Sequence, residues 1–134
     1  MLDHILDDAL LGHLKAAPPL AGLNGYTGQD NAEHKLPALT VSTTSEPLAG
    51  SDSAFRGEVG VTIESEAHDT TPAAHAERVE AVRTLLAKRA EVIAALNAAG
   101  KVHIYGYAPL GTEQTAGEAR FTTKLKYRFG FGTP

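Results

Sequence analysis

A strict two-residue alternation near the C-terminus constrains the fold of this chain more than any other feature. Between Arg120 and Phe131, apolar or aromatic residues alternate with basic and polar ones. Successive side chains of a β-strand point to opposite faces, so this pattern predicts a strand with one face in a core and a basic opposite face. The core-facing set is Phe121, Thr123, Leu125, Tyr127, Phe129 and Phe131, and the other set is Arg120, Thr122, Lys124, Lys126 and Arg128.

Three earlier segments also have the character of strands. Residues 36–43 form a short run in which Pro37 is restricted to the strand start or to a sheet edge. Residues 58–64 alternate clearly between aliphatic and polar side chains. The run KVHIYGYA, at 101–108, is the third. Together with the C-terminal segment, these runs predict a sheet of four strands.

The N-terminal segment shows helical spacing. Its apolar residues fall on one stripe, and Pro18 and Pro19 end the helix because proline cannot continue it. The stripe consists of Leu2, Ile5, Leu6, Ala9, Leu10 and Leu14, and we expect Asp3, Asp7, Asp8 and Lys15 to lie away from it.

A second helical segment follows the second predicted strand. Thr71 and Pro72 form a typical helix start, with a hydroxyl for the N-cap and proline at the first helical position. The apolar stripe continues to Gly100, a typical C-terminal stop. The pattern leaves open whether this helix is continuous or kinks near Lys88 and Arg89.

The predicted order is helix, strand, strand, helix, strand, strand. This order indicates an α+β fold, with a small, mostly antiparallel four-stranded sheet and two helices packed on one face. With 134 residues, the chain predicts a single domain over 1–134. If the second and third strands are parallel, the helical crossover between them is right-handed.

Three long connections separate these elements. Residues 17–35 are rich in Gly, Pro, Asn and Asp and predict a flexible loop, and residues 44–56 and 109–118 predict two further loops. Together the loops take up about a third of the chain, which is more than a compact domain usually needs. Because no catalytic motif accompanies them, we interpret them as assembly arms.

Composition excludes several classes of function. The formal net charge of -4 gives no global electrostatic signature for nucleic-acid binding. The absence of cysteine excludes disulfides, thiolate nucleophiles and cysteine-based zinc sites. Acidic residues stand where a signal peptide carries Lys or Arg, and no apolar run approaches the ~20 residues needed to span a bilayer.

Carboxylates and imidazoles are dense around the strand-to-helix junction at 63–86. A small metal-dependent hydrolase using Glu64, Glu66, His68 and His75 is one hypothesis, although no H-E-x-x-H motif is present. A solvated junction is the favoured interpretation, because acids are stabilised at a helix N-terminus. We therefore predict no catalytic residue, no metal ligand and no cofactor. The dense set is Glu64, Glu66, His68, Asp69, His75 and Glu77.

The polar face of the predicted sheet is the candidate subunit interface. It combines both charge signs with aromatic residues, a mixture found where protein subunits meet. A solvated face with cross-strand ion pairs is the simpler alternative. A ligand-binding face around Tyr105 and Tyr107, or weak nucleic-acid binding by the basic residues, are further alternatives. The candidate residues are Glu58, Thr62, Glu64, His103, Tyr105, Tyr107, Lys124, Lys126 and Arg128.

Residues 57–132 resemble the tail terminator proteins (also called tail completion or neck proteins) of long-tailed bacteriophages. The resemblance rests on the run GEVGVTIESEAHDTTPAAHAERVEAVRTLL, on KVHIYGYAPLG and on the closing FTTKLKYRFGFG. The N-terminal helix and the first strand agree in order only.

The resemblance implies a small α/β subunit that assembles as a hexameric ring on the tail tube. Such a ring ends tube polymerisation and joins the tail to the head connector, and DNA passes through it. It implies location in the virion after assembly in the host cytoplasm, with no catalysis, cofactor, membrane or specific nucleic-acid contact. Another head–tail joining protein or a minor tail protein is the alternative. In a ring, the acidic second strand and the basic fourth strand would lie on complementary sides of the subunit.

Overall fold

The computed structural model describes residues 2–28, 34–68, 70–116 and 119–133. These residues form an α+β fold with a five-stranded sheet in the order β1-β2-β3-β5-β4. The elements are α1 (Leu2–Lys15), the 3-10 helix η1 (Pro18–Leu20), β1 (Asn24–Thr27), β2 (Ala38–Pro47), β3 (Ala54–Glu66), α2 (Pro72–Ala87), α3 (Arg89–Asn97), β4 (His103–Ala116) and β5 (Arg120–Gly132).

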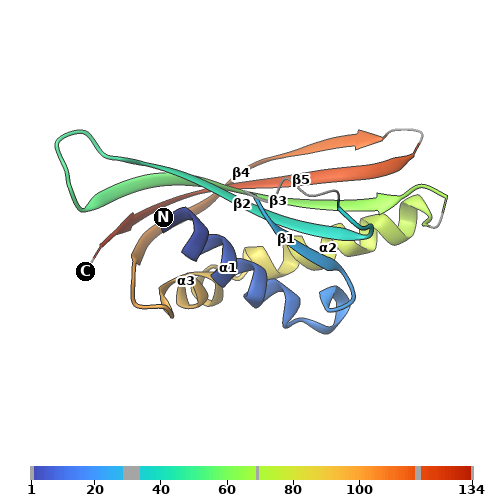
Figure 1. Cartoon of the computed structure of the whole chain (residues 1–134), viewed down its shortest axis with the longest axis horizontal. Helices are drawn as coiled ribbons and strands as arrows, with labels where there is room; N and C mark the ends of the chain where they lie inside the picture. The colour runs from blue at the N-terminus through green and yellow to red at the C-terminus, as the bar shows by residue number, and fades with distance from the viewer. Residues whose placement is uncertain (1, 29–33, 69, 117–118, 134) are drawn as a thin grey trace.

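The molecule has two layers, with the helices on one face of the sheet (Figure 1). The core lies between the layers, where aliphatic residues of the helices meet one face of β2, β3 and β5. Largest among the fully buried side chains is Phe131, which stacks on Phe55 and Phe129 at ring-centroid distances of 5.0 and 5.6 Å. The predicted alternation of β5 is confirmed, because its apolar set faces the helices.

The second helical segment begins as predicted. The Thr71 hydroxyl accepts a hydrogen bond from the Ala74 amide at 3.1 Å, and Pro72 occupies the first turn. The segment divides at Lys88, whose ψ of 77° interrupts the helical backbone. The two pieces are α2 and α3, so the prediction of two α-helices was wrong by one. Gly100 follows with a φ of +70°, a conformation that glycine adopts without strain.

Strand pairing is antiparallel throughout, except that β1 runs parallel to β2. The crossover through α2 and α3 connects β3 to β4, which are not neighbours, because β5 lies between them and pairs with both. The sheet is therefore mixed and has one strand more than predicted. The extra strand is β1, a four-residue edge strand within the predicted loop 17–35.

The long loops predicted at 44–56 and 109–118 are mostly strand. In the structure β2 extends to Pro47, β3 begins at Ala54, and β4 continues to Ala116. These segments lack apolar alternation, but backbone pairing with a neighbouring strand holds them in the sheet, which is why pattern alone missed them. These segments thus belong to two hairpins, β2–β3 and β4–β5, that reach out at opposite ends of the sheet (Figure 1).

Asp7 also departs from its predicted place. It lies buried on α1, at 2% exposure, beside Thr43 of β2, although the helical pattern placed it away from the apolar stripe. Burial raises the pKa of Asp7 to about 6, and polar groups of Thr43 and Gly28 offset part of this shift. The buried stripe is broader than predicted because α1 packs against β1, β2 and α3 together.

Candidate interaction face

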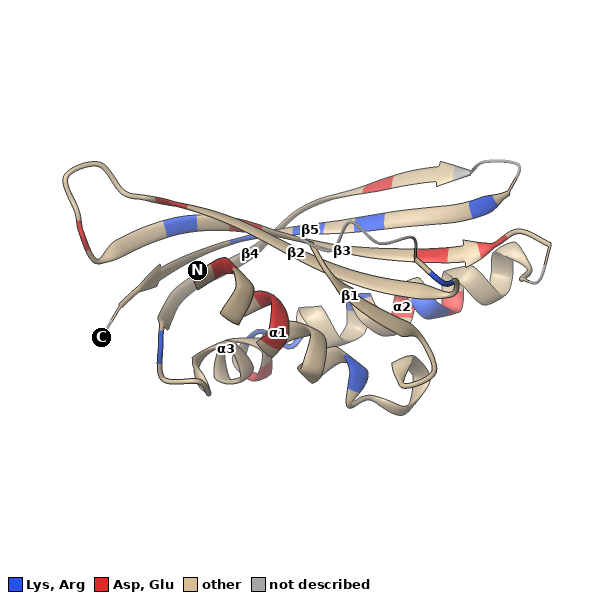
Figure 2. Cartoon of the chain, in the orientation of Figure 1, with Lys and Arg blue, Asp and Glu red and all other residues tan. Residues whose placement is uncertain are grey.

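The face of the sheet opposite the helices is polar and has no helix over it among the described residues (Figure 1). Basic residues follow β5, and acidic residues lie on the strands around it (Figure 2). The register explains this arrangement: Glu58 lies opposite Arg128, Thr62 opposite Lys124, and Glu113 opposite Lys124. The acidic strand β3 and the basic strand β5 are therefore neighbours. The hypothesis that they form two complementary sides of the subunit was wrong.

Ion pairs link much of this face. Arg56 contacts Glu46 across the β2–β3 hairpin at 2.6 Å, and Lys126 contacts Glu113 between β5 and β4. The hydrogen bond and the charge of the partner raise the pKa of Lys126 and lower that of Glu113. Both pairs are solvent-exposed, so their contribution to stability is small. This part of the face agrees with the simpler alternative of a solvated surface with cross-strand pairs.

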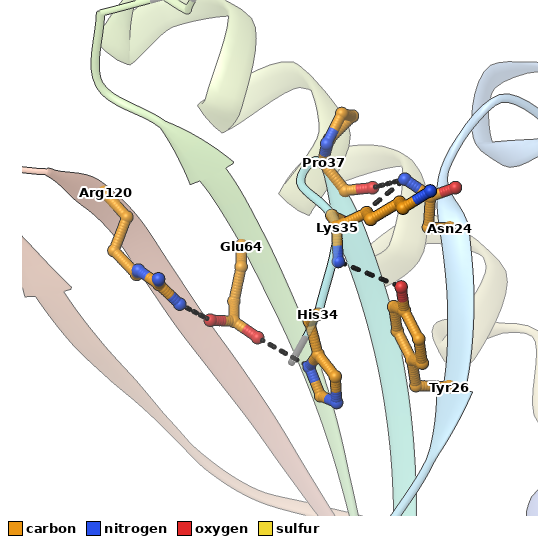
Figure 3. A network of polar contacts seen from close by, with 7 residues as sticks. All are labelled: Asn24, Tyr26, His34, Lys35, Pro37, Glu64 and Arg120. Atoms are coloured by element: carbon orange, nitrogen blue, oxygen red, sulfur yellow. Dashed lines mark hydrogen bonds and ion pairs between the residues drawn. The ribbon is translucent and has the colours of Figure 1, made fainter. Parts of the chain in front are cut away.

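Glu64 lies between the side chains of Arg120 and His34 (Figure 3). One carboxylate oxygen accepts from the Arg120 guanidinium at 2.8 Å, and the other is 3.3 Å from Nδ1 of His34. Its side chain is 14% exposed. The carboxylate is thus engaged within the molecule.

The same network holds the segment 34–37 beside β1 and Glu64 (Figure 3). The His34 ring stacks on Tyr26 of β1, with centroids 4.0 Å apart and planes at 9°. The Tyr26 hydroxyl accepts from the Lys35 amide at 2.9 Å, and the Asn24 side-chain amide donates to the Lys35 carbonyl at 3.0 Å. These contacts connect the edge strand β1 to the start of β2 and to Glu64.

Two register shifts in β4 change which side chains reach the polar face. They lie between Ile104 and Gly106 and between Pro109 and Gly111, so Tyr105 and Leu110 are the bulged residues. A β-bulge redirects side chains away from the regular alternation. Tyr105 and Leu110 are 53% and 45% exposed, and they are the exposed large hydrophobic residues of the described chain.

The first bulge also turns Tyr107 to the opposite face. Its ring stacks on Tyr127 with centroids 5.3 Å apart, and its hydroxyl donates to the Leu86 carbonyl of α2 at 3.0 Å. Burial, followed by the neighbouring Tyr127, raises the pKa of Tyr107. The prediction that Tyr107 shares the polar face with His103 and Tyr105 was wrong, because the bulge shifts the alternation by one residue.

A groove of about 760 Å³ lies where the two bulged residues meet the strands β2, β3 and β5. Of the predicted interface residues, Glu58, Tyr105 and Arg128 come together in it, and Tyr107 borders it. The other predicted residues that lie on the polar face but not in the groove lining are His103, Thr62, Lys124 and Lys126.

The groove also contains Glu46, Arg56 and Leu110, which sequence reasoning missed because it assigned them to loops. Gly106 and Gly111 directly follow the two bulged residues, and glycine within a strand is the sequence signal that could have revealed the bulges.

The predicted acidic and histidine cluster is divided between the two faces. Glu64 and Glu66 lie on the polar side of β3, and the Glu66 carboxylate is 3.2 Å from Nε2 of His68. His75 is buried on the helix side. Glu77 is exposed on α2, and Asp69 lies outside the described residues. Across 2–28, 34–68, 70–116 and 119–133, no group of three or more His, Asp or Glu side chains could hold a metal ion.

His75 instead belongs to a buried polar cluster between α2 and the sheet. Its Nδ1 lies 2.8 Å from the Ser65 hydroxyl of β3, and its Nε2 lies 2.9 Å from the Thr123 hydroxyl of β5. Arg78, one turn further along α2, donates to the same Ser65 oxygen at 2.7 Å. Burial, followed by the charge of Arg78, lowers the pKa of His75. Ser65 is completely buried, so the arrangement does not present a nucleophile to substrate.

Comparison with known proteins assigns no family to the chain. No family model matches the sequence, and no curated protein matches it. One solved structure, for which no function is stated, is similar with a TM-score of 0.49 and 18% sequence identity, over 98% of this chain and 92% of that chain. None of the helices in the described residues has the length and apolar character needed to cross a membrane.

Proposed function

We propose that the chain is a virion structural protein that caps the tail tube of a long-tailed bacteriophage. In this proposal it assembles as a hexameric ring, ends tail polymerisation and joins the tail to the head connector. The proposal begins from the resemblance of residues 57–132 to tail terminator proteins. The groove on the polar face is then a contact surface of the assembled subunit.

The two bulges of β4 are the observation that carries this proposal. Each interrupts a paired strand, and each leaves a large apolar side chain in solvent, at Tyr105 and Leu110. Both side chains line the same groove. An exposed apolar patch with a polar rim is typical of a protein–protein interface. The rim consists of Glu46, Arg56, Glu58 and Arg128.

The geometry of a ring limits what can fill the groove. Because Tyr105 and Leu110 are the exposed large hydrophobics of the described chain, an apolar contact between two copies would join groove to groove. Such a contact is isologous and gives a dimer, whereas a ring needs a different surface of the neighbour. The mixed charges of the groove suit a polar neighbouring surface.

Native mass spectrometry of the purified chain and of Leu110→Asp tests the proposal. We expect hexamers of the wild type and monomers of the variant, because the new carboxylate would have to be desolvated in the contact. Ala94→Asp is the matched control, since it adds the same charge at an exposed position of α3. Circular dichroism verifies that all three proteins are folded.

Two outcomes would contradict the ring. A wild-type dimer that Leu110→Asp converts to monomer would indicate the isologous contact. A wild-type chain that stays monomeric at its highest soluble concentration would favour the alternative of another head–tail joining or minor tail protein. In that alternative the groove binds a different protein.

A further inference from the structure

We propose that His75 is an acid-sensitive latch that holds the N-terminal half of α2 against the sheet and releases it when the imidazole is protonated. This device is independent of the proposed function. It rests on the buried cluster of His75, Ser65, Thr123 and Arg78 and on the groups that surround it.

The imidazole bridges three elements at once. His75 projects from the first turns of α2, its Nδ1 meets Ser65 of β3 and its Nε2 meets Thr123 of β5. Ser65 is completely buried, so water cannot replace its lost partner without movement of the helix. The hydrogen bonds therefore couple the position of α2 to the protonation of a single ring.

Arg78 favours one tautomer of the imidazole. A guanidinium can only donate, so its bond at 2.7 Å occupies a lone pair of the Ser65 oxygen. Among the printed contacts of the described residues, Nδ1 of His75 is the one that can accept the Ser65 proton. Nε2 consequently carries the ring proton and donates to the Thr123 hydroxyl. The neutral ring offers one acceptor nitrogen to the two hydroxyls, whereas the imidazolium offers none.

Protonation of Nδ1 disrupts this arrangement in two ways. The Ser65 oxygen would receive donors from both His75 and Arg78, and its own buried proton would lose its acceptor. The imidazolium would also lie beside the Arg78 guanidinium, with which it shares this oxygen. The charged imidazolium is therefore less favourable than the neutral imidazole while α2 is packed against the sheet.

The surroundings contain no described carboxylate that bonds to the ring. On β3, the neighbours Glu64 and Glu66 lie on the opposite face, and on β5 Thr123 is accompanied by Phe121, whose ring centroid is 5.7 Å from that of His75.

The helices and β4 bring no unpaired acidic group to the ring among the described residues. On α2, Glu80 pairs with Arg83 at 3.0 Å. From β4, Gln114 and Thr115 approach, and η1, which also contacts α2, has no titratable residue. The charged residues at the start of α3, Arg89 and Glu91, are exposed.

Protons reach the ring through a depression of about 420 Å³ beside α2. His75 lines it together with Val79, Phe121 and Gln114. Opening of α2 would enlarge this depression and expose Phe121 and Val79. The latch therefore connects acidification to the exposure of a small apolar surface between α2 and the β4–β5 hairpin.

NMR of the full chain between pH 7.5 and 5 tests the latch. The ring nitrogens of His75 should show the Nε2–H tautomer at pH 7.5 and titrate below the ordinary histidine range. Amide exchange within 72–87, corrected for intrinsic rates, should accelerate on acidification by about tenfold for each unit of lowered pKa. Amides of β3 and α1 should keep their protection.

Two variants distinguish the latch from a purely structural histidine. His75→Gln should remove the pH dependence of exchange in 72–87, and Arg78→Gln should move the His75 titration upward because the like charge is gone. An Nδ1–H tautomer, an ordinary His75 titration, or equal acid-induced loss of protection in α2 and β3 would each overturn the proposal. The wild-type measurements decide the question even if His75→Gln fails to fold.

Discussion

The two faces of the sheet satisfy polar groups in opposite ways. On the helix-covered face, His75, Ser65 and Thr123 bond to one another away from water. On the polar face, pairs such as Lys126 with Glu113 remain in contact with solvent. Removing a partner should therefore be costly on the covered face, where nothing replaces it, and nearly neutral on the polar face, where water does. The polar face can accordingly carry an interaction surface without loss of stability.

Truncation of the largest buried side chain should produce the greatest contrast between the faces. Phe131→Ala removes a completely buried ring that stacks on Phe55 and Phe129, and should lower the free energy of unfolding by about 3–5 kcal/mol. Tyr105→Ala on the polar face is the counterpart, with an expected change of about 0.5 kcal/mol. Urea unfolding measures both, and similar losses would refute the comparison.

The carboxylate of Asp7 is buried on the helix-covered side of the sheet, where polar partners stabilise its charge only in part. Its Oδ1 has no hydrogen-bond partner in the described chain, and its pKa of about 6 exceeds the ordinary 3.8. The native state binds the Asp7 proton more tightly than the unfolded chain does, so the contribution of Asp7 to stability is greatest at low pH and falls as pH rises from about 4 through 6. Asp7→Asn should raise the free energy of unfolding at pH 7.5 by about 3 kcal/mol and remove this slope. Urea titrations from pH 4 to 7.5 measure it; an unchanged slope would contradict the assignment.

Alanine substitution of Gly57 and Gly60, two glycines of β3, compares the two faces within one strand. A methyl group at Gly57 would lie 2.7 Å from the Phe129 ring and 2.9 Å from the Thr44 carbonyl oxygen, both held in place by packing or pairing. At Gly60 it would meet only the flexible end of Lys124. Gly57→Ala should destabilise by about 1–3 kcal/mol, whereas Gly60→Ala should leave the thermal midpoint almost unchanged. Equal midpoints for the two variants would contradict the comparison.

The exposed ion pairs should give the smallest effect. Exchange of the charges in Lys126→Glu with Glu113→Lys retains the pair, and each single reversal places like charges across β4 and β5. We expect the double variant to unfold at the wild-type urea midpoint and the single variants only slightly below it, with the difference reduced by salt. A large loss that salt does not change would show that this pair is not solvated as we describe.

Sequence periodicity determined those elements whose burial alternates regularly. β5 and the central part of β3 were predictable because one side chain in two enters the core, and the start of α2 was predictable because its Thr71 cap is a local interaction. The charged and aromatic composition of the polar face was also visible from the sequence, including Glu58, Tyr105 and Arg128 of the groove.

Only the tertiary structure decided the rest. The outer parts of β2 and β4, and the whole of β1, are strands because neighbouring strands pair with their backbones, and backbone pairing leaves no periodic signal in side chains. Two bulges placed Leu110 in the groove and moved Tyr107 out of the polar face, since one inserted residue reverses every later side chain. The neighbouring positions of β3 and β5 likewise turned a predicted pair of complementary sides into one internally paired surface.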